Sequence, residues 1–66
     1  MLYRVTLCIA TASTNRVEDL PISAVSREEA ASSAKSFMES KYWNSYRTEA
    51  KVEVIAIEPS HPSEWR

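Results

Sequence analysis

A short segment near residue 45 carries the side chains best suited to chemistry in this sequence. Three aromatic residues and one arginine fall between positions 42 and 47: Tyr42, Trp43, Tyr46 and Arg47. These residue types are enriched at protein-binding hot spots, because they offer large contact areas with a polar group attached. Aromatic rings also stack on nucleic-acid bases. The segment predicts a binding surface, and the alternative is that one ring closes the end of a small core.

Catalytic chemistry is not indicated elsewhere in the chain. Cys8 lies in a strand pattern with no base beside it, and His61 stands between a serine and a proline. Glu28 and Glu29 are explained as residues that cap a helix. A nucleophile, a base and an orienting group cannot be assembled from the remaining residues. We expect no enzyme and no catalytic residue.

Cofactor and metal sites are also not expected. The chain contains no glycine. Glycine-rich phosphate loops, dinucleotide fingerprints and nucleophile elbows all need glycine where the backbone approaches a ligand or adopts a positive φ. The single cysteine and single histidine are far apart in sequence, so they form no recognisable metal-ligand pattern.

The charge balance disfavours nucleic acid as the partner. Eight Lys and Arg residues and nine Asp and Glu residues give a net charge of -1. The basic residues are scattered singly, whereas nucleic-acid binding needs a concentrated basic surface. Apolar runs are far shorter than the roughly 20 residues of a membrane span. The first ten residues alternate rather than forming the apolar core of a signal peptide. We expect no membrane partner and a cytoplasmic location.

Two strands are predicted in the first 25 residues. Residues 3–11 alternate in period two, with Tyr3, Val5, Leu7 and Ile9 on one face. Such alternation is typical of a half-buried strand. Residues 18–25 form a second strand. Pro21 cannot donate a hydrogen bond to a neighbouring strand, so this strand is placed at an edge of the sheet.

A helix is predicted over residues 27–42. Ser26 and Glu29 have the spacing of a capping box, and Val25 and Ala30 that of a hydrophobic staple. Helical spacing then produces a narrow apolar stripe. Its members are Ala30, Ala34, Phe37, Met38 and the stem of Lys41, with Ala31 and Tyr42 at its margin.

A third strand is predicted over residues 50–58. Strict alternation places Val52, Val54 and Ala56 on one face. The other face carries Lys51, Glu53, Ile55 and Ile57. Residues 59–66 contain Pro59 and Pro62, so an irregular tail is expected. The whole chain, residues 1–66, is predicted to form a single domain.

These elements predict an α+β fold of the ββαβ type. The first two strands form a hairpin, and a right-handed crossover through the helix leads to the third strand. Because Pro21 marks the second strand as an edge, the third strand pairs with the first on its other side. We therefore expect a three-stranded antiparallel sheet of order 2-1-3, with one helix packed on one face.

One helix leaves the other face of the sheet without a covering layer. The apolar residues predicted on that face are Cys8, Val17, Val25, Ile55 and Ile57. Three explanations are open. The tail with Trp65 folds over part of the face; the exposure is scattered, or a bulge near Val54 and Ile55 turns isoleucines inward; or a partner or second copy covers the face.

The third strand is also expected to have a free edge. Only Lys51 and Glu53 would deter another strand from pairing with it. A domain this small is marginally stable and often gains stability from a partner subunit, so a homodimer through the sheet is one expectation. The predicted partner-binding residues are Tyr42, Trp43, Tyr46, Arg47, Lys51, Glu53, Ile55 and Ile57.

The arrangement of these motifs resembles two groups of small proteins. It combines a Tyr-x-Val-x-Leu strand, the segment Val25 to Ala30, an Ala/Ser-rich helix and a Val-x-Val-Ile-x-Ile strand. One group is the ββαβ proteins of bacteriophages and mobile elements, some of them anti-CRISPR or other anti-defence inhibitors. This resemblance implies a stoichiometric inhibitor of a large host complex, acting in the host cytoplasm.

The second group is the small archaeal ribosomal protein of the LX type. That resemblance implies a nucleic-acid-binding domain using Trp43, Tyr46, Arg47 and Lys51. Ribosomal proteins are usually basic, which weighs against this alternative for a slightly acidic chain. Both resemblances concern the layout of the chain alone, so no functional residue is carried over from either group.

Overall fold

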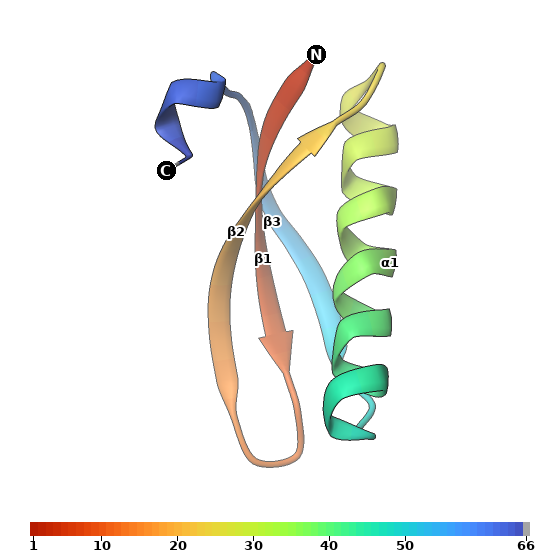
Figure 1. Cartoon of the computed structure of the whole chain (residues 1–66). Helices are drawn as coiled ribbons and strands as arrows, with labels where there is room; N and C mark the ends of the chain where they lie inside the picture. Colours follow the sequence, from red (N-terminus) through yellow and green to blue (C-terminus); the bar gives the residue numbers. More distant parts are fainter. Residues whose placement is uncertain (66) are drawn as a thin grey trace.

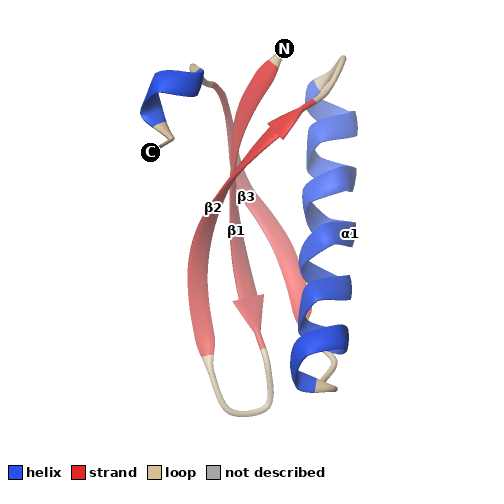
Figure 2. Ribbon diagram, in the orientation of Figure 1, coloured by secondary structure: helices blue, strands red, loops and turns tan. Residues whose placement is uncertain are grey.

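A three-stranded sheet and one long helix make up the structure, a computed structural model that describes residues 1–65 (Figure 1). The strands are β1 (Leu2–Ala10), β2 (Asn15–Ser23) and β3 (Lys51–Pro59), and the helix is α1 (Arg27–Tyr46). Both strand pairs are antiparallel, and the order in the sheet is β2-β1-β3. Figure 2 shows α1 on one side of this sheet. The predicted α+β fold and strand order are confirmed.

The central strand β1 supplies most of the core. Val5, Leu7 and Ile9 are fully buried, and Tyr3 is nearly so. Their neighbours at even positions are only half-buried, because successive side chains of a strand point to opposite faces. Hydrophobic burial on the odd positions therefore fixes which face of the sheet meets the helix.

The edge strand β2 lies earlier in the chain than predicted. It begins at Asn15 and ends at Ser23, because Ser23 is the residue that pairs with Leu2, at the start of β1. Val25 therefore lies outside the sheet and is 86% exposed. The expected packing of Val25 as a hydrophobic staple, and its place on the open face, are both corrected.

The helix begins as predicted and continues four residues further. The Ser26 side chain accepts a hydrogen bond from the Glu29 N–H at 3.2 Å, which caps the first turn. The residues buried against the sheet are spaced four apart: Ala30, Ala34, Met38 and Tyr42. Phe37 lies beside this row and is 55% exposed, so its predicted place in the core is wrong.

A β-bulge in β3 changes which residues face the helix. Thr6 pairs with Ala56 and Leu7 with Val54, so Ile55 is an extra residue between two pairs. The bulge reverses the alternation beyond it, and Ile57 packs against the core opposite Val5. The prediction that Ile57 lies on the open face, available to a partner, is therefore corrected.

The C-terminal segment folds back over one end of the open face. A short 3-10 turn spans Pro62–Glu64, and Figure 1 shows it on the opposite side of the sheet from α1. Arg4, on the open face of β1, lies over the ring of Trp65 and forms an ion pair with Glu64. The predicted tail is thus an ordered cover for part of the sheet, while position 66 lies outside the described residues.

Candidate functional site

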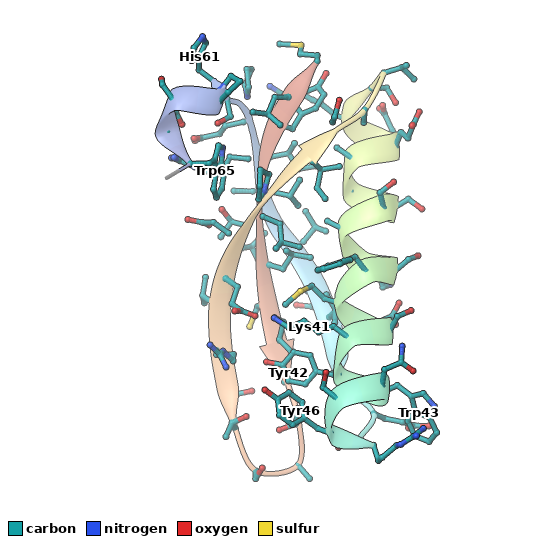
Figure 3. All side chains as sticks on the ribbon, viewed as in Figure 1. Lys41, Tyr42, Trp43, Tyr46, His61 and Trp65 are labelled. Atoms are coloured by element: carbon teal, nitrogen blue, oxygen red, sulfur yellow. The ribbon has the colours of Figure 1, made fainter. Side chains whose placement is uncertain are left out.

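The predicted aromatic segment forms the C-terminal end of α1, and the structure divides its rings between two sides. Trp43 is 51% exposed and Tyr46 is 61% exposed. Figure 3 shows Tyr46 directed toward the loop that joins β1 and β2, and Trp43 directed away from it. We call Trp43, Tyr46 and Arg47 the helix-end cluster. Its members surround the last turn of the helix rather than forming one flat patch.

Tyr42 serves the core and supports its neighbour. It is 5% exposed, so the prediction that Tyr42 contacts a partner is corrected. Its ring centroid lies 5.3 Å from that of Tyr46, with the ring planes inclined by 49°. Residues four apart lie on the same face of a helix, and tilted aromatic pairs at this distance are favourable. The buried Tyr42 ring therefore supports Tyr46 in its exposed position.

A groove separates Tyr46 from the hairpin loop. It has a volume of about 390 Å³. The residues that line it come from three segments: Thr11, Ala12, Ser13, Thr14, Arg16, Tyr42, Tyr46 and Thr48. The loop is closed by the Thr11 N–H, which donates to the Thr14 carbonyl at 2.8 Å. The groove is therefore bounded by hydroxyl groups on the loop side and by tyrosine rings on the helix side.

This groove is not predicted by the sequence. Its hairpin residues lie more than twenty-five positions from Tyr46 in the chain. The signal that could have found them is the topology itself. In a β-β-α-β chain with an antiparallel hairpin, the first loop and the end of the helix lie at the same end of the sheet, as Figure 1 shows.

Trp43 occupies a different, more acidic pocket. The pocket has a volume of about 420 Å³ and is lined by Glu39, Trp43, Thr48, Glu49 and Ala50. The carboxylates of Glu39 and Glu49 therefore line the same pocket as the indole ring. The pocket also contacts Ala50, the residue before β3. An indole flanked by carboxylates suits a partner with a cationic or hydrogen-bond-donating group.

Arg47 ends the helix in a strained backbone conformation. Its φ is 54° and its ψ is 35°, which is the left-handed region, and its N–H donates to the Trp43 carbonyl at 3.0 Å. Helices commonly end in this way on glycine or asparagine. Because this chain has no glycine, an exposed arginine takes this position.

The remaining predicted residues lie on the open face of β3. Lys51 and Glu53 are exposed and pair with Ala10 and Cys8 of β1. Ile55 is exposed at the bulge. These positions are separate from Tyr46 and adjacent along the chain to the Trp43 pocket. Lys51, Glu53 and Ile55 are therefore accessible, but they do not form one continuous surface with the whole helix-end cluster.

Two residues of types that often act in catalysis are His61 and Cys8. His61 caps the 3-10 turn, with Nδ1 accepting from the Ser63 N–H at 3.2 Å. Cys8 is a free, half-buried thiol. Within residues 1–65, no three His, Cys, Asp or Glu side chains are grouped to hold a metal ion. In the same residues, no helix is long and apolar enough to cross a membrane.

Comparisons with protein-family models, with curated protein sequences and with solved structures find no match for this chain.

Proposed function

We propose that this chain is a protein-binding module whose contact surface is the helix-end cluster. The observation that carries the proposal is the exposure of Trp43 and Tyr46, by half or more of their surfaces, in a core that is filled without them. Tryptophan and tyrosine are also residue types enriched at the hot spots of protein–protein interfaces. Tyr46 is also held in place by Tyr42, so little side-chain freedom would be lost on binding.

The acidic surroundings of Trp43 support a protein rather than a nucleic-acid partner. Glu39 and Glu49 line the same pocket as the indole ring, and a phosphate backbone would be repelled there. The basic residues that follow Trp43 in the sequence, Arg47 and Lys51, are separated by Glu49 and followed by Glu53. Nucleic-acid binding remains the rival function, and it requires a basic surface that these residues do not assemble.

The finer proposal is a stoichiometric inhibitor of a larger bacterial complex. A domain of this size has no room for a deep pocket, but exposed anchors on a rigid element suit binding to a preformed surface. The phage-protein resemblance in the layout of the chain supports the same reading. Inhibition would then follow from occupying a surface of the target in the host cytoplasm, without any reaction by the inhibitor.

The test is affinity capture from a bacterial lysate with the immobilised protein and two matched variants. Tyr46→Ala removes a ring from the helix-end cluster. Phe37→Ala removes a ring of similar exposure from the middle of the same helix, away from the cluster. We expect one protein complex to be captured at a fixed ratio by the wild type and by Phe37→Ala, and not by Tyr46→Ala.

A gel-shift experiment at low salt separates the rival function. Charge-driven nucleic-acid binding appears at low salt and falls steeply as salt is added. We expect no shift with single-stranded or duplex probes. A salt-sensitive shift, or equal capture of one complex by all three baits, argues against a protein-binding role for the helix-end cluster.

A further inference from the structure

The outer edge of β2 is the accessible edge of the sheet. At the opposite edge, Val52 of β3 is 3% exposed, and the groove beside it is lined by Glu28 and Lys35 of α1. The helix therefore covers that edge, and the expectation of a free edge at the third strand is corrected. Along β2, by contrast, Asn15 and Val17 are exposed, and the exposed fraction of Val17 is 60%.

The register of the sheet shows which backbone groups of β2 face its outer edge. Beyond one end of the strand, the Ala24 N–H donates to the Met1 carbonyl at 3.0 Å, and the Met1 amine donates to the Ala24 carbonyl at 3.2 Å. Beyond the other end, the Thr11 N–H donates to the Thr14 carbonyl at 2.8 Å. Because backbone direction alternates along a strand, even-numbered positions of β2 face β1 and odd-numbered positions face outward.

Asn15, Val17 and Asp19 consequently direct their N–H and C=O groups to the outer edge. Pro21 is the next residue in this series, and it has no N–H, so the edge that another strand can use ends before it. The side chains of this series lie on the open face, where the Thr6 hydroxyl donates to the Asp19 carboxylate at 2.7 Å. The stretch from Asn15 to Asp19 is therefore a short template for strand pairing.

Two antiparallel copies of this stretch can pair about a two-fold axis at Val17. Val17 then lies opposite Val17 of the other copy, and Asn15 lies opposite Asp19. Each of these pairs exchanges two backbone hydrogen bonds. Arg16 of each copy lies opposite Glu18 of the other, at a non-hydrogen-bonded position where Cα atoms approach to about 4.5 Å. Opposite charges at such positions stabilise the pairing.

Charge selects this register over its neighbours. Within one chain, Arg16 Nη2 lies 3.4 Å from Glu18 Oε1, and both residues pair with buried residues of β1, so they share the helix-facing side. Sliding one copy by two residues keeps the backbone pattern, but it places Arg16 opposite Arg16 or Glu18 opposite Glu18. Like charges directly opposite each other are destabilising. The two charges are therefore complementary to themselves under two-fold symmetry.

We infer that β2 pairs with β2 of a second copy of this chain, centred on Val17, to join the two sheets into one. The two valines, each 60% exposed in the single chain, become neighbours on the open face. The interface is closed by its symmetry, so it makes a dimer and not a filament. It also occupies an edge that is otherwise a template for aggregation.

This inference does not rest on the proposed function. The groove beside Tyr46 is lined by Arg16, whereas Val17 is on the open face and does not line it. Tyr46→Ala should therefore lose capture of a target and still dimerise. Failure of the dimer and failure of target capture are thus separate results.

A proline at the two-fold axis tests the pairing by sedimentation equilibrium across a wide range of concentrations. We expect the wild type to dimerise. Val17→Pro removes an outward N–H and, as at Pro21, leaves the hydrogen bonds to β1 in place. It should weaken dimerisation by at least about tenfold. Ser23→Pro is the matched control, because it removes an outward N–H beyond the paired stretch, and its dissociation constant should stay within about threefold of the wild type. Circular dichroism checks that each variant is folded.

Charge reversal is a second test that leaves the backbone unchanged. Arg16→Glu and Glu18→Arg each convert two opposite-charge pairs between the copies into like-charge pairs. Each should weaken dimerisation by about tenfold or more. The double variant exchanges the two charges and should return to the wild-type dissociation constant within about threefold.

A third measurement needs no variant. Mixing isotope-labelled and unlabelled wild-type protein should give an NMR contact between the Hα of Arg16 in one copy and the Hα of Glu18 in the other. The inference is overturned if the wild type is monomeric at all concentrations, or if a folded Val17→Pro dimerises as the wild type does. It is also overturned if single charge reversals leave the dimer unchanged, if the double variant does not recover, or if the Hα contact is missing in a dimer.

Discussion

The guanidinium carbon of Arg4 lies 5.3 Å from the ring centroid of Trp65, joining the first strand to the last described residue. Glu64 accepts hydrogen bonds from Arg4 at 2.8 Å and from the Ser60 hydroxyl at 3.0 Å. The Ser60 hydroxyl in turn accepts from the Trp65 Nε1–H at 2.9 Å. These contacts hold the C-terminal segment over one end of the open sheet face.

The Arg4 and Trp65 contact should be measurable by a double-mutant cycle. Arg4→Ala, Trp65→Ala and the double variant are compared by chemical denaturation. We expect a coupling of about 0.5–1 kcal/mol, because the pair is partly exposed and water weakens the attraction of a cation to a ring. A cycle that sums to zero would show that the tail does not depend on this contact.

Truncation of Met38 should destabilise the fold much more than truncation of Phe37. Met38 is fully buried, so Met38→Ala should lower the free energy of unfolding by about 2–5 kcal/mol. Phe37 is more than half exposed, so Phe37→Ala should cost less than about 1 kcal/mol. Urea titration of both variants checks the ranking, and a larger loss for Phe37→Ala would mean that the helix presents a different face to the sheet.

The N-cap bond of α1 should make a smaller contribution than the core. Ser26→Ala removes the hydroxyl that accepts from the Glu29 N–H, and we expect a loss of about 1 kcal/mol in the free energy of unfolding. Ser26→Asp serves as the control, because aspartate also caps a helix and should retain most of the stability. Equal losses in the two variants would argue against a capping role.

Arg47 should be a position where glycine stabilises the fold. Among residues 1–65 it alone has a positive φ, of 54°. A residue with a Cβ is disfavoured there by about 1–2 kcal/mol, and glycine removes that cost while losing about 0.5–1 kcal/mol through chain entropy. Arg47→Gly should therefore raise the free energy of unfolding by up to about 1 kcal/mol. Arg47→Ala, which keeps the Cβ, should show no gain, and a gain as large as that of glycine would contradict the explanation.

Periodicity was sufficient to predict the sheet, because alternating burial on β1 and the position of Pro21 on β2 are local signals with one topological solution. It failed at β3. A bulge adds one residue at Ile55 and reverses the faces beyond it, so Ile57 is half-buried rather than exposed. No local feature of a Val-Ile-Ala-Ile run distinguishes a regular strand from a bulged one, because the choice depends on how the strand fits its neighbour.

At the end of the helix, the sequence also predicted the candidate site only in part. Aromatic residue types identified the segment after Lys41, but not which ring is buried. Tyr42 completes the row of buried residues four apart, and the helix continues beyond it to Tyr46. Phe37, the more apolar side chain, lies outside that row because Ala30, Ala34 and Met38 set the line of contact with the sheet. That line depends on the angle between helix and sheet, which sequence spacing alone does not determine.

The most direct test of the central claim is a melting curve of the Trp43→Ala and Tyr46→Ala double variant, recorded alongside capture from the same lysate. If the two rings bind a protein and do not support the fold, capture is lost. The melting temperature then moves by less than about 4–8 °C, the shift that about 1 kcal/mol produces in a domain of this size. An unfolded variant would place the rings in the core, and a variant that still captures the complex would contradict their role in binding.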